Sequence, residues 1–298
     1  MIDFHELQLE DRLWADPLLH RAEYIGCEFC FGNMYIWRRT YNTRIAKVGG
    51  NLTTFCHGDQ NGIYLFPTGP ADLRGTIELL RQDARERGIP FSMFGVYGNN
   101  LQFLESLYPG QFSKETSDDW ADYIYRASDL IHLPGQKYHG KRNHIARFRS
   151  QYDYTYEPLT ARNLGECRAM WMEWQTHHDK SVETENDAVR DAFDYFEALG
   201  LSGGLIRAAE KGGGAARVVA FSMGEPINDD VYCVHIEKAF ADVEGAYPVI
   251  NQEFSAANAG DRTYINREED LGIDGLRRAK QSYHPVMWLK KYRVTFYE

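Results

Sequence analysis

The sequence predicts a mixed α/β protein made of two domains with the same order of helices and strands. Three observations support this prediction. The chain has 298 residues, enough for two domains of ordinary size that each bury a core. Its composition, 43% hydrophobic and 26% charged, is typical of a folded protein, and its 14% aromatic content favours sheets. Strand-like and helix-like apolar periodicities alternate in an order that occurs twice.

The first half of the chain begins with three strands, which are followed by a helix, a strand, a short helix and a strand. The predicted ranges are, in chain order, 44–48, 51–56, 62–66, 71–87, 91–96, 99–107 and 119–126. The first helix has the clearest signal, because Leu73, Ile77 and Leu80 fall on one face and Gly88 follows as a C-cap.

The second half opens with two helices and then repeats the same order of elements. The predicted ranges are 161–178, 187–199, 203–209, 216–224, 231–238, 246–259, 262–267, 273–281 and 286–297. Gly212 to Gly214 and Asn228 to Asp230 separate the three strands, and both runs tolerate the positive φ of tight turns. Each half therefore follows the pattern βββαβαβ, which indicates a duplication.

A three-strand meander followed by a crossover helix into a parallel strand is the element order of the GCN5-related N-acetyltransferase fold. Two such units in one chain make a tandem arrangement. We expect an N-terminal acetyltransferase-like domain over 1–132, without catalytic function. We expect a basic linker helix over 133–152 and a C-terminal acetyltransferase-like domain over 153–298, which carries the working site.

The net charge of −10 conceals two segments of the chain that are basic. That value alone disfavours an anionic partner. Residues 137–152, however, contain five basic and no acidic side chains, and residues 275–297 contain six basic and no acidic ones. Such runs are commonly solvated surfaces. Their clustering, with aromatic and amide side chains interleaved in the first, also suits phosphate contact and stacking.

Four segments carry a family resemblance: 133–149, 234–239, 244–254 and above all 264–285, which begins Tyr-Ile-Asn-Arg-Glu-Glu-Asp-Leu-Gly. They resemble stand-alone bacterial proteins similar to the C-terminal domain of phosphatidylglycerol lysyltransferase, which is related to the Fem peptidyltransferases. The resemblance implies a tandem acetyltransferase-like fold. For the larger relatives it implies transfer of an aminoacyl group from aminoacyl-tRNA to a lipid head group, and for the Fem enzymes to a cell-wall precursor. For stand-alone members it implies the fold more firmly than the substrate.

The acyl donor of an acetyltransferase is expected where the strand before the crossover helix diverges from its neighbour, with its pyrophosphate on the helix N-terminus. In the second half this place is 239–246, where Gly245 is the only glycine and Asp242 and Glu244 add negative charge. The segment 67–72 of the first half also lacks the glycine pattern. Acyl-coenzyme A is therefore disfavoured and kept as an alternative donor.

Five side chains are candidates for catalysis near this place. His235 and Glu237 lie two residues apart on one predicted strand, and Asn266 and Glu268 lie two apart at the end of the next. We expect a histidine or carboxylate among them to act as general base, and Tyr283 as proton donor to a leaving group. An ion pair with a neighbouring cation, or a buried structural histidine, is the alternative for each.

A second set of side chains is predicted to bind the phosphates of the donor or a developing oxyanion. These residues are Lys137, His139, Lys141, Arg142, Asn143, Arg267, Arg277 and Lys280. No metal site is expected, because Cys27 and Cys30 have a spacing of metal ligands but only His57 lies near them in sequence. The adjacent His177 and His178 would point about 100° apart on a helix.

Three functions remain open at this point. The first is an acyl- or aminoacyltransferase that takes aminoacyl-tRNA as donor and a small molecule, peptide or lipid head group as the amine or hydroxyl acceptor. The second is an acyl-coenzyme A dependent N-acyltransferase, and the third a non-catalytic binding protein with the same double fold. Because no apolar run approaches the roughly 20 residues of a membrane helix, we expect a cytoplasmic protein. Peripheral contact with the inner membrane surface is a minor alternative.

Overall fold

The computed structural model describes residues 1–57, 62–176 and 183–297. The chain divides into two compact units, and neither is continuous in sequence. Unit 1 comprises Met1–Tyr123, Glu269–Arg277 and Trp288–Glu298, and unit 2 comprises Ile124–Glu268 and Arg278–Met287. Two seven-stranded sheets combine parallel and antiparallel pairs, which confirms the predicted mixed α/β class.

The first sheet belongs to unit 1. Its strands are, in spatial order, β1 (His5–Glu6), β2 (Arg44–Val48), β3 (Asn51–Cys56), β4 (Ile63–Leu65), β5 (Ser92–Val96), β14 (Tyr292–Phe296) and β6 (Phe112–Glu115). Within it β4 and β5 are parallel neighbours, because α4 (Leu73–Arg87) crosses over between them. This helix ends at Gly88 with φ 69°, the C-cap that the sequence predicts.

Further helices of unit 1 are short or lie near its N-terminus. They are η1 (Leu9–Asp11), α1 (Arg12–Arg21), η2 (Cys27–Phe29), α2 (Phe31–Ile36), α3 (Arg38–Tyr41), α5 (Gly98–Leu107) and η3 (Asp118–Trp120). The core below the sheet is aromatic, with Phe4, Tyr64, Phe91 and Phe296 buried in it. Part of the high Phe and Tyr content of the sequence therefore lies in this core.

The second sheet contains the meander of the second half. Its strands are, in spatial order, β13 (Met287–Leu289), β7 (Asp122–Arg126), β12 (Tyr264–Asn266), β11 (Val231–Ala239), β10 (Arg217–Pro226), β9 (Ser202–Glu210) and β8 (Tyr152–Pro158). The helices of this part are α6 (Ala127–His132), η4 (Gln136–Tyr138), α7 (His139–Gln151), α8 (Leu164–Thr176), α9 (Glu183–Asp194), α10 (Ala246–Asn258) and α11 (Asp274–Gln281).

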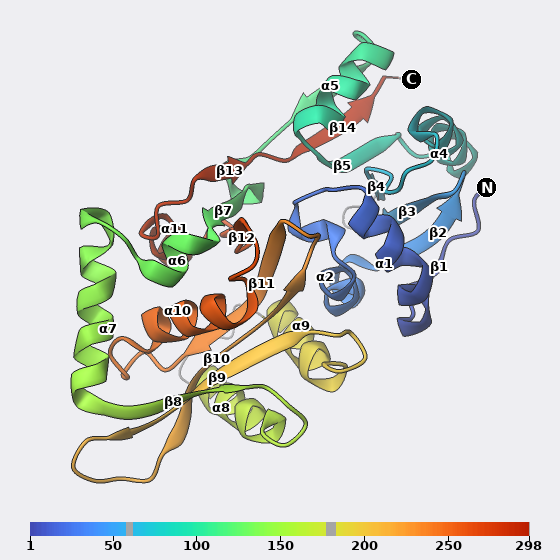
Figure 1. Cartoon of the computed structure of the whole chain (residues 1–298). Coiled ribbons are helices and arrows are strands. Elements are labelled where there is room, and N and C mark those ends of the chain that lie inside the picture. The colour runs from blue at the N-terminus through green and yellow to red at the C-terminus, as the bar shows by residue number, and fades with distance from the viewer. Residues whose placement is uncertain (58–61, 177–182, 298) are drawn as a thin grey trace. The chain divides into compact units, whose positions relative to one another are not determined.

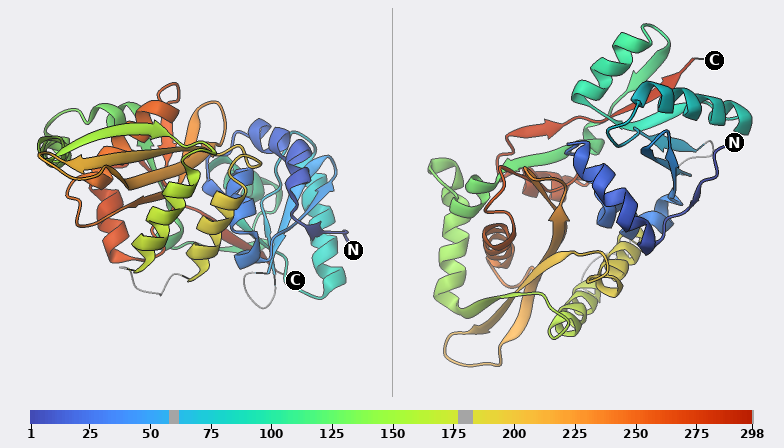
Figure 2. Two further views of the ribbon diagram at one scale, coloured as in Figure 1. Left: turned by 90° about the horizontal axis from the view of Figure 1, so that it is seen from below. Right: turned by 45° about the vertical axis from the view of Figure 1, so that its right-hand side comes forward.

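Helix packing in unit 2 fixes the position of β10 and β11. Helices α8 and α9 lie side by side (Figure 2), with the rings of Trp171 and Phe193 5.8 Å apart. Phe193 in turn packs on Phe221 of β10 at 5.4 Å. Helix α10 crosses from β11 to β12, which makes those two strands parallel neighbours.

The order βββαβ occurs in both halves as predicted, through β2 to β5 and through β9 to β12. The single final strand predicted over 286–297 is wrong, because the chain there forms two strands, β13 and β14, which lie in different sheets. The break falls at Lys290 and Lys291, and the Lys291 side chain is buried among carboxylates. The domain limits predicted from the sequence stay a prediction.

Candidate functional site in unit 2

The parallel strands β11 and β12 stay together for only three residues. Val231 pairs with Tyr264 and Cys233 with Asn266, after which β12 ends while β11 continues to Ala239. Beyond this pairing β11 continues its ladder with β10 alone, and the chain after Asn266 leaves β11. We call His235, Glu237, Arg267 and Glu268, which lie there, the strand-end cluster.

A β-bulge sets the direction of His235. Met223 of β10 pairs with Ile236, but the next residue, Gly224, pairs with Val234, so His235 is the extra residue of β11. Such a bulge interrupts the alternation of side chains and turns one of them in a new direction. The Cβ of a larger residue at Gly224 would lie 2.1 Å from the Cys233 carbonyl oxygen, so the bulge also requires this glycine.

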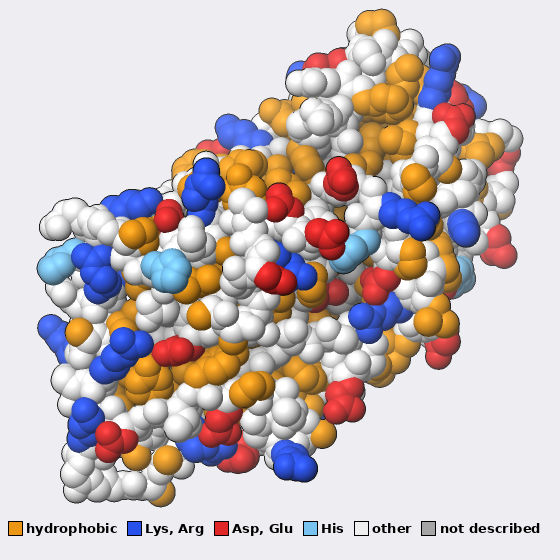
Figure 3. Space-filling view, viewed as in Figure 1, with side chains coloured by type: hydrophobic (Ala, Val, Ile, Leu, Met, Phe, Trp, Pro, Cys, Tyr) orange, Lys and Arg blue, Asp and Glu red, His pale blue; other side chains and the backbone are white. Residues whose placement is uncertain are grey.

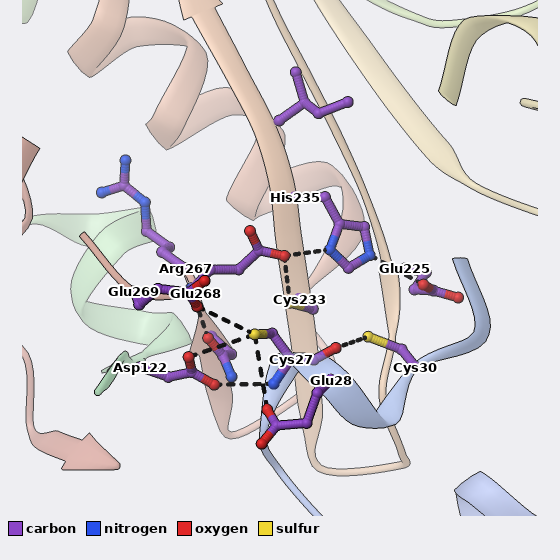
Figure 4. A network of polar contacts seen from close by, with 12 residues as sticks. Cys27, Glu28, Cys30, Asp122, Glu225, Cys233, His235, Arg267, Glu268 and Glu269 are labelled. Carbon is purple, nitrogen blue, oxygen red and sulfur yellow. Dashed lines mark hydrogen bonds and ion pairs between the residues drawn. The ribbon is translucent and has the colours of Figure 1, made fainter. Parts of the chain in front are cut away.

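His235 lies between two carboxylates (Figure 4). Its Nδ1 is 2.8 Å from Glu268 Oε1 and its Nε2 is 3.0 Å from Glu225 Oε1, with 1% of its side chain exposed. Although burial alone lowers the pKa of His235, Cys233 and the two carboxylates raise it well above the usual value. The two carboxylates favour the imidazolium form, in which both ring nitrogens donate. The role of His235 as general base stays a prediction.

The backbone at Glu268 is held in an unusual conformation. Its φ is 58°, in the left-handed region that non-glycine residues rarely adopt. Asn266 Oδ1 accepts a hydrogen bond from the Glu268 N–H at 2.7 Å, which stabilises the turn directly after β12. Asn266 is fully buried. Its predicted catalytic role stays a prediction.

Glu237 and Arg267 form the other half of the strand-end cluster. Arg267 Nη2 donates to Glu237 Oε1 at 2.8 Å, and Asn251 of α10 donates to Glu237 Oε2 at 3.1 Å. Two polar atoms beside this pair are buried and lack a hydrogen-bond partner within the described part of the chain: Arg267 Nη1 and Asn251 Oδ1. A buried donor left without a partner costs about 1–3 kcal/mol, so a ligand that satisfies it binds favourably.

Tyr283 brings two cations together. Lys141 Nζ lies 3.8 Å from the centroid of its ring and the Arg267 guanidinium carbon 5.0 Å from it. Burial and the Arg267 charge lower the pKa of Lys141 to about 8. Burial also raises the pKa of Tyr283, which keeps its hydroxyl protonated. The arrangement therefore concentrates positive charge beside a phenol that can donate a proton.

The Lys280 ammonium forms hydrogen bonds with backbone carbonyl oxygens of the chain. Its Nζ donates to the carbonyl oxygens of Arg267 at 2.6 Å and Glu268 at 3.2 Å, and the residue is 7% exposed. It thereby holds the segment that follows β12. Its predicted contact with a donor phosphate stays a prediction.

The other predicted phosphate-binding residues have different surroundings. Lys137 pairs with Asp129 at 3.2 Å, and the exposed His139 contacts Asn143 at 3.1 Å. Arg142 Nη1 donates to two backbone carbonyl oxygens. Arg277 lies in unit 1 and is bound by Asp270 and Asp119, so carboxylates of the chain already neutralise it.

Unit 1 contains a buried charged cluster that sequence reasoning missed. Lys291 Nζ lies 2.7 Å from Asp122, 2.8 Å from Glu28 and 3.3 Å from Cys27 Sγ. Cys27 also lies beside Asp122 in Figure 4, and its N–H donates to that carboxylate at 2.9 Å. The partners are 95 to 264 residues apart in sequence, so no local spacing indicates them. Cys27, Glu28 and Asp122 are close enough to share a metal ion, and the Lys291 ammonium lies against all three.

His177, His178 and Asp179 lie outside the described residues. Within those that are described, no helix has the length and apolar character needed to cross a membrane.

Comparison with known proteins identifies the family to which the chain belongs. Residues 20–295 match the family model described as phosphatidylglycerol lysyltransferase, C-terminal. A conserved protein of unknown function from Bacteroides thetaiotaomicron VPI-5482 is 38% identical, with 100% of both chains covered and a TM-score of 0.92. L-PGS from Bacillus licheniformis is 16% identical over 88% of this chain and 90% of its own, with a TM-score of 0.61.

FemX shares the fold at 10% identity, with 98% and 97% of the two chains covered and a TM-score of 0.60. An uncharacterised protein of Mycoplasmoides gallisepticum is 19% identical over 66% of this chain, and the match spans 62% of that relative's length. The resemblance predicted from the sequence, including the relation to the Fem proteins, is confirmed. The chain therefore belongs to a transferase family, that of the phosphatidylglycerol lysyltransferase C-terminal domain.

Proposed function

We propose that this chain is an aminoacyltransferase, which takes an aminoacyl group from aminoacyl-tRNA and transfers it to an amine or hydroxyl acceptor. Membership of a family named for a lysyltransferase supports aminoacyl transfer. The observation that carries the proposal is Arg267 Nη1, a buried cationic donor without a partner among the described residues. It suits the oxygen that gains negative charge when an ester carbonyl is attacked.

The reaction proceeds by attack of the acceptor oxygen or nitrogen on the carbonyl carbon of the aminoacyl ester. The bond between that carbon and the ribose oxygen breaks, and the proton lost by the acceptor is balanced by one gained by the ribose. Arg267 stabilises the oxyanion, an effect typically worth 10²–10³ in rate. Glu237, oriented by Arg267 and Asn251, accepts the proton of the acceptor. Tyr283 gives a proton to the ribose oxygen, and exchange with water then deprotonates Glu237 and reprotonates the Tyr283 phenolate.

His235 is a positioning residue in this scheme. Its imidazolium holds the Glu268 carboxylate and thereby the left-handed turn that directly follows Arg267. The Arg267 side chain depends on that turn for its direction. A histidine that is already protonated does not compete with Glu237 for the proton of the acceptor.

The loop before α10 favours this donor over acyl-coenzyme A. In an acetyltransferase its amides hold the pyrophosphate. Here the N–H groups of Phe240, Val243 and Ala246 donate to carbonyl oxygens of Val219, Phe240 and Val243. The amides of Phe240, Val243 and Ala246 are thus already used by the backbone, and Asp242 and Glu244 repel a phosphate.

Transfer of labelled amino acids from charged tRNA tests the proposal, with phosphatidylglycerol vesicles and soluble amines as acceptors. Arg267→Lys keeps the positive charge but replaces the two terminal nitrogens of the guanidinium, one for Glu237 and one for the oxyanion, by a single nitrogen. We therefore expect the rate to fall about 100-fold. Glu237→Gln is expected to reduce the rate to a similar degree. Arg278→Lys is the matched control, because Arg278 is exposed on α11. Acylation from acetyl-coenzyme A, with no transfer from any charged tRNA, would contradict the proposal.

A further inference from the structure

Lys291 is enclosed within unit 1, which is unusual for a lysine. On the face shown in Figure 3, lysine and arginine side chains reach the surface in many places. Lys291 by contrast is 2% exposed, and its ammonium lies 2.7 Å from Asp122 and 2.8 Å from Glu28. A third carboxylate, that of Glu269, lies 3.8 Å away. These ion pairs fix the place of the ammonium, because a buried charge is costly without them.

The Cys27 thiol lies directly against this ammonium. Lys291 Nζ is 3.3 Å from Cys27 Sγ, and Cys27 is 5% exposed. The same sulfur lies 3.4 Å from Asp122 Oδ1 and 3.4 Å from Glu269 Oε2, and Figure 4 shows it among these carboxylates. A nitrogen and a sulfur are thus in contact, with oxygens around them that accept protons.

The backbone holds both members of this pair in place. The Cys27 N–H donates to Asp122 Oδ2 at 2.9 Å, and the Lys291 carbonyl oxygen accepts from Thr116 Oγ1 at 2.8 Å. The neighbouring thiol of Cys30 donates to the Cys27 carbonyl oxygen at 3.0 Å, and its sulfur faces that oxygen in Figure 4. Holding two groups in one geometry removes most of the entropic cost of bringing them together for a reaction.

We propose that Cys27 and Lys291 form an oxidative cross-link, in which one oxygen atom joins Sγ to Nζ. The oxidant is dioxygen, a small apolar molecule that enters buried sites. The S–H bond, one N–H bond of the neutral amine and the O–O bond break, and S–O and N–O bonds form. The second oxygen atom leaves as water with the two hydrogens. Sulfur and nitrogen lose two electrons each, and dioxygen takes up all four. This modification site does not depend on the proposed function.

The ammonium has to lose one proton before its nitrogen bonds to oxygen. Burial alone lowers the pKa of Lys291, but Asp122, Cys27 and two glutamates raise it well above the usual value. The reaction therefore requires a proton acceptor within reach. Glu28 lies 2.8 Å from Nζ, and burial raises the pKa of its carboxyl, which makes it a better acceptor than an exposed carboxylate.

Mass spectrometry of the whole chain tests the cross-link. Protein purified under argon with a reductant is compared with the same protein kept in air-saturated buffer. We expect the second to be about 14 Da heavier, because it gains one oxygen and loses two hydrogens. Trypsin should then release residues 22–38 joined to residues 291–293, since it does not cleave after a modified lysine. Two equivalents of dithiothreitol should restore the original mass, because their four hydrogens regenerate thiol and amine and release water.

Matched variants separate the pair from its neighbours. Cys27→Ser should abolish the gain of mass, whereas Cys30→Ser should keep it, because the Cys30 sulfur faces a backbone oxygen. Lys291→Arg keeps a positive charge among the carboxylates but has no amine, so it should also abolish the gain. Lys290→Arg, at an exposed position, should not.

A measurement on the wild type covers the case in which the Cys27 or Lys291 variant does not fold. In concentrated urea the chain has the same residues without the contact, and we expect no link between residues 27 and 291 there. A link that forms equally well in urea would overturn the proposal. So would Cys27 found after air exposure only as a thiol, as a sulfinic or sulfonic acid, or in a disulfide with Cys30.

Discussion

His235 and Glu268 are joined by a buried hydrogen bond of 2.8 Å between the bulge of β11 and the turn after β12. The same ring contacts Glu225 on β10 at 3.0 Å. One positive charge thus compensates two carboxylates in a place with almost no access to water. The stability of this part of unit 2 depends on that charge.

Replacing His235 by alanine is expected to lower the free energy of unfolding by about 3–5 kcal/mol, because two buried carboxylates lose their cation. Urea denaturation at pH 7 measures the change. The double variant with Glu268→Gln should recover part of the loss. A loss below about 1 kcal/mol would mean that His235 is neutral in the folded protein.

The same contact predicts a dependence on pH. The pKa of His235 is raised in the folded protein above its value of about 6.5 in the unfolded chain. Its contribution is therefore fully present below pH 6.5 and is lost as the pH rises through the folded pKa. The difference in unfolding free energy between the wild type and the His235→Ala variant should shrink at alkaline pH. A difference that grows with pH would contradict this.

The contribution of Lys141 to stability changes with pH in the opposite direction to that of His235. Its pKa of about 8 lies below the ordinary 10.5, so between these values the unfolded chain binds more protons and stability rises with pH. Lys141→Met should stabilise the protein by about 1 kcal/mol at pH 7, a figure reduced for solvent screening, and the gain should vanish near pH 10.5. Thermal melts at several pH values measure this. Destabilisation at pH 7 would show that Lys141 is favourably paired.

In unit 1, Lys291→Ala should create a site for a soft divalent ion. Removal of the ammonium leaves Cys27, Glu28 and Asp122 facing one another, a ligand set suited to Zn²⁺ or Cd²⁺. We expect the variant to unfold more easily by about 3–5 kcal/mol without metal and to regain stability with it. Lys290→Ala, at an exposed position, should show neither effect. Equal melting with and without Cd²⁺ would refute this reading of the cluster.

Gly245 is predicted to tolerate no side chain. Its φ is 87°, and a Cβ there would lie 2.5 Å from the His144 carbonyl oxygen and 2.9 Å from Phe148 Cβ. Gly245→Ala should therefore lower the unfolding free energy by about 1–3 kcal/mol through strain between α7 and α10. Gly275→Ala is the control, since a Cβ at Gly275 would meet nothing within 4 Å. Equal melting temperatures would show that the two helices separate easily.

Local patterns predicted the elements well where apolar periodicity was strong, as in α4 and in the meander of β9 to β11. Which side chains contact one another in the folded protein was harder to predict. Alternation placed His235 and Glu237 on one face of a strand, but the bulge gives them separate partners. The sequence alone does not indicate the role of Glu225, because its contact with His235 depends on the register of β10 against β11.

The charged residues show the same limit. The basic run of 137–152 was visible in the sequence, whereas the carboxylates that neutralise some of its members come from α6 and from the loop before α10. Arg277 and Lys280, three residues apart, have a carboxylate and a carbonyl environment respectively. Composition counts charges, but only the tertiary structure assigns their partners.

Strand β14 lies between β5 and β6, although nearly 180 residues separate its start from the end of β6. During synthesis the first sheet is therefore interrupted until residues 292–296 have left the ribosome, and its early strands wait with an unpaired edge. The N-terminal half is then not an independent folding unit. A chain truncated before Tyr292 should be recognised by chaperones and proteases rather than accumulate as a half-protein.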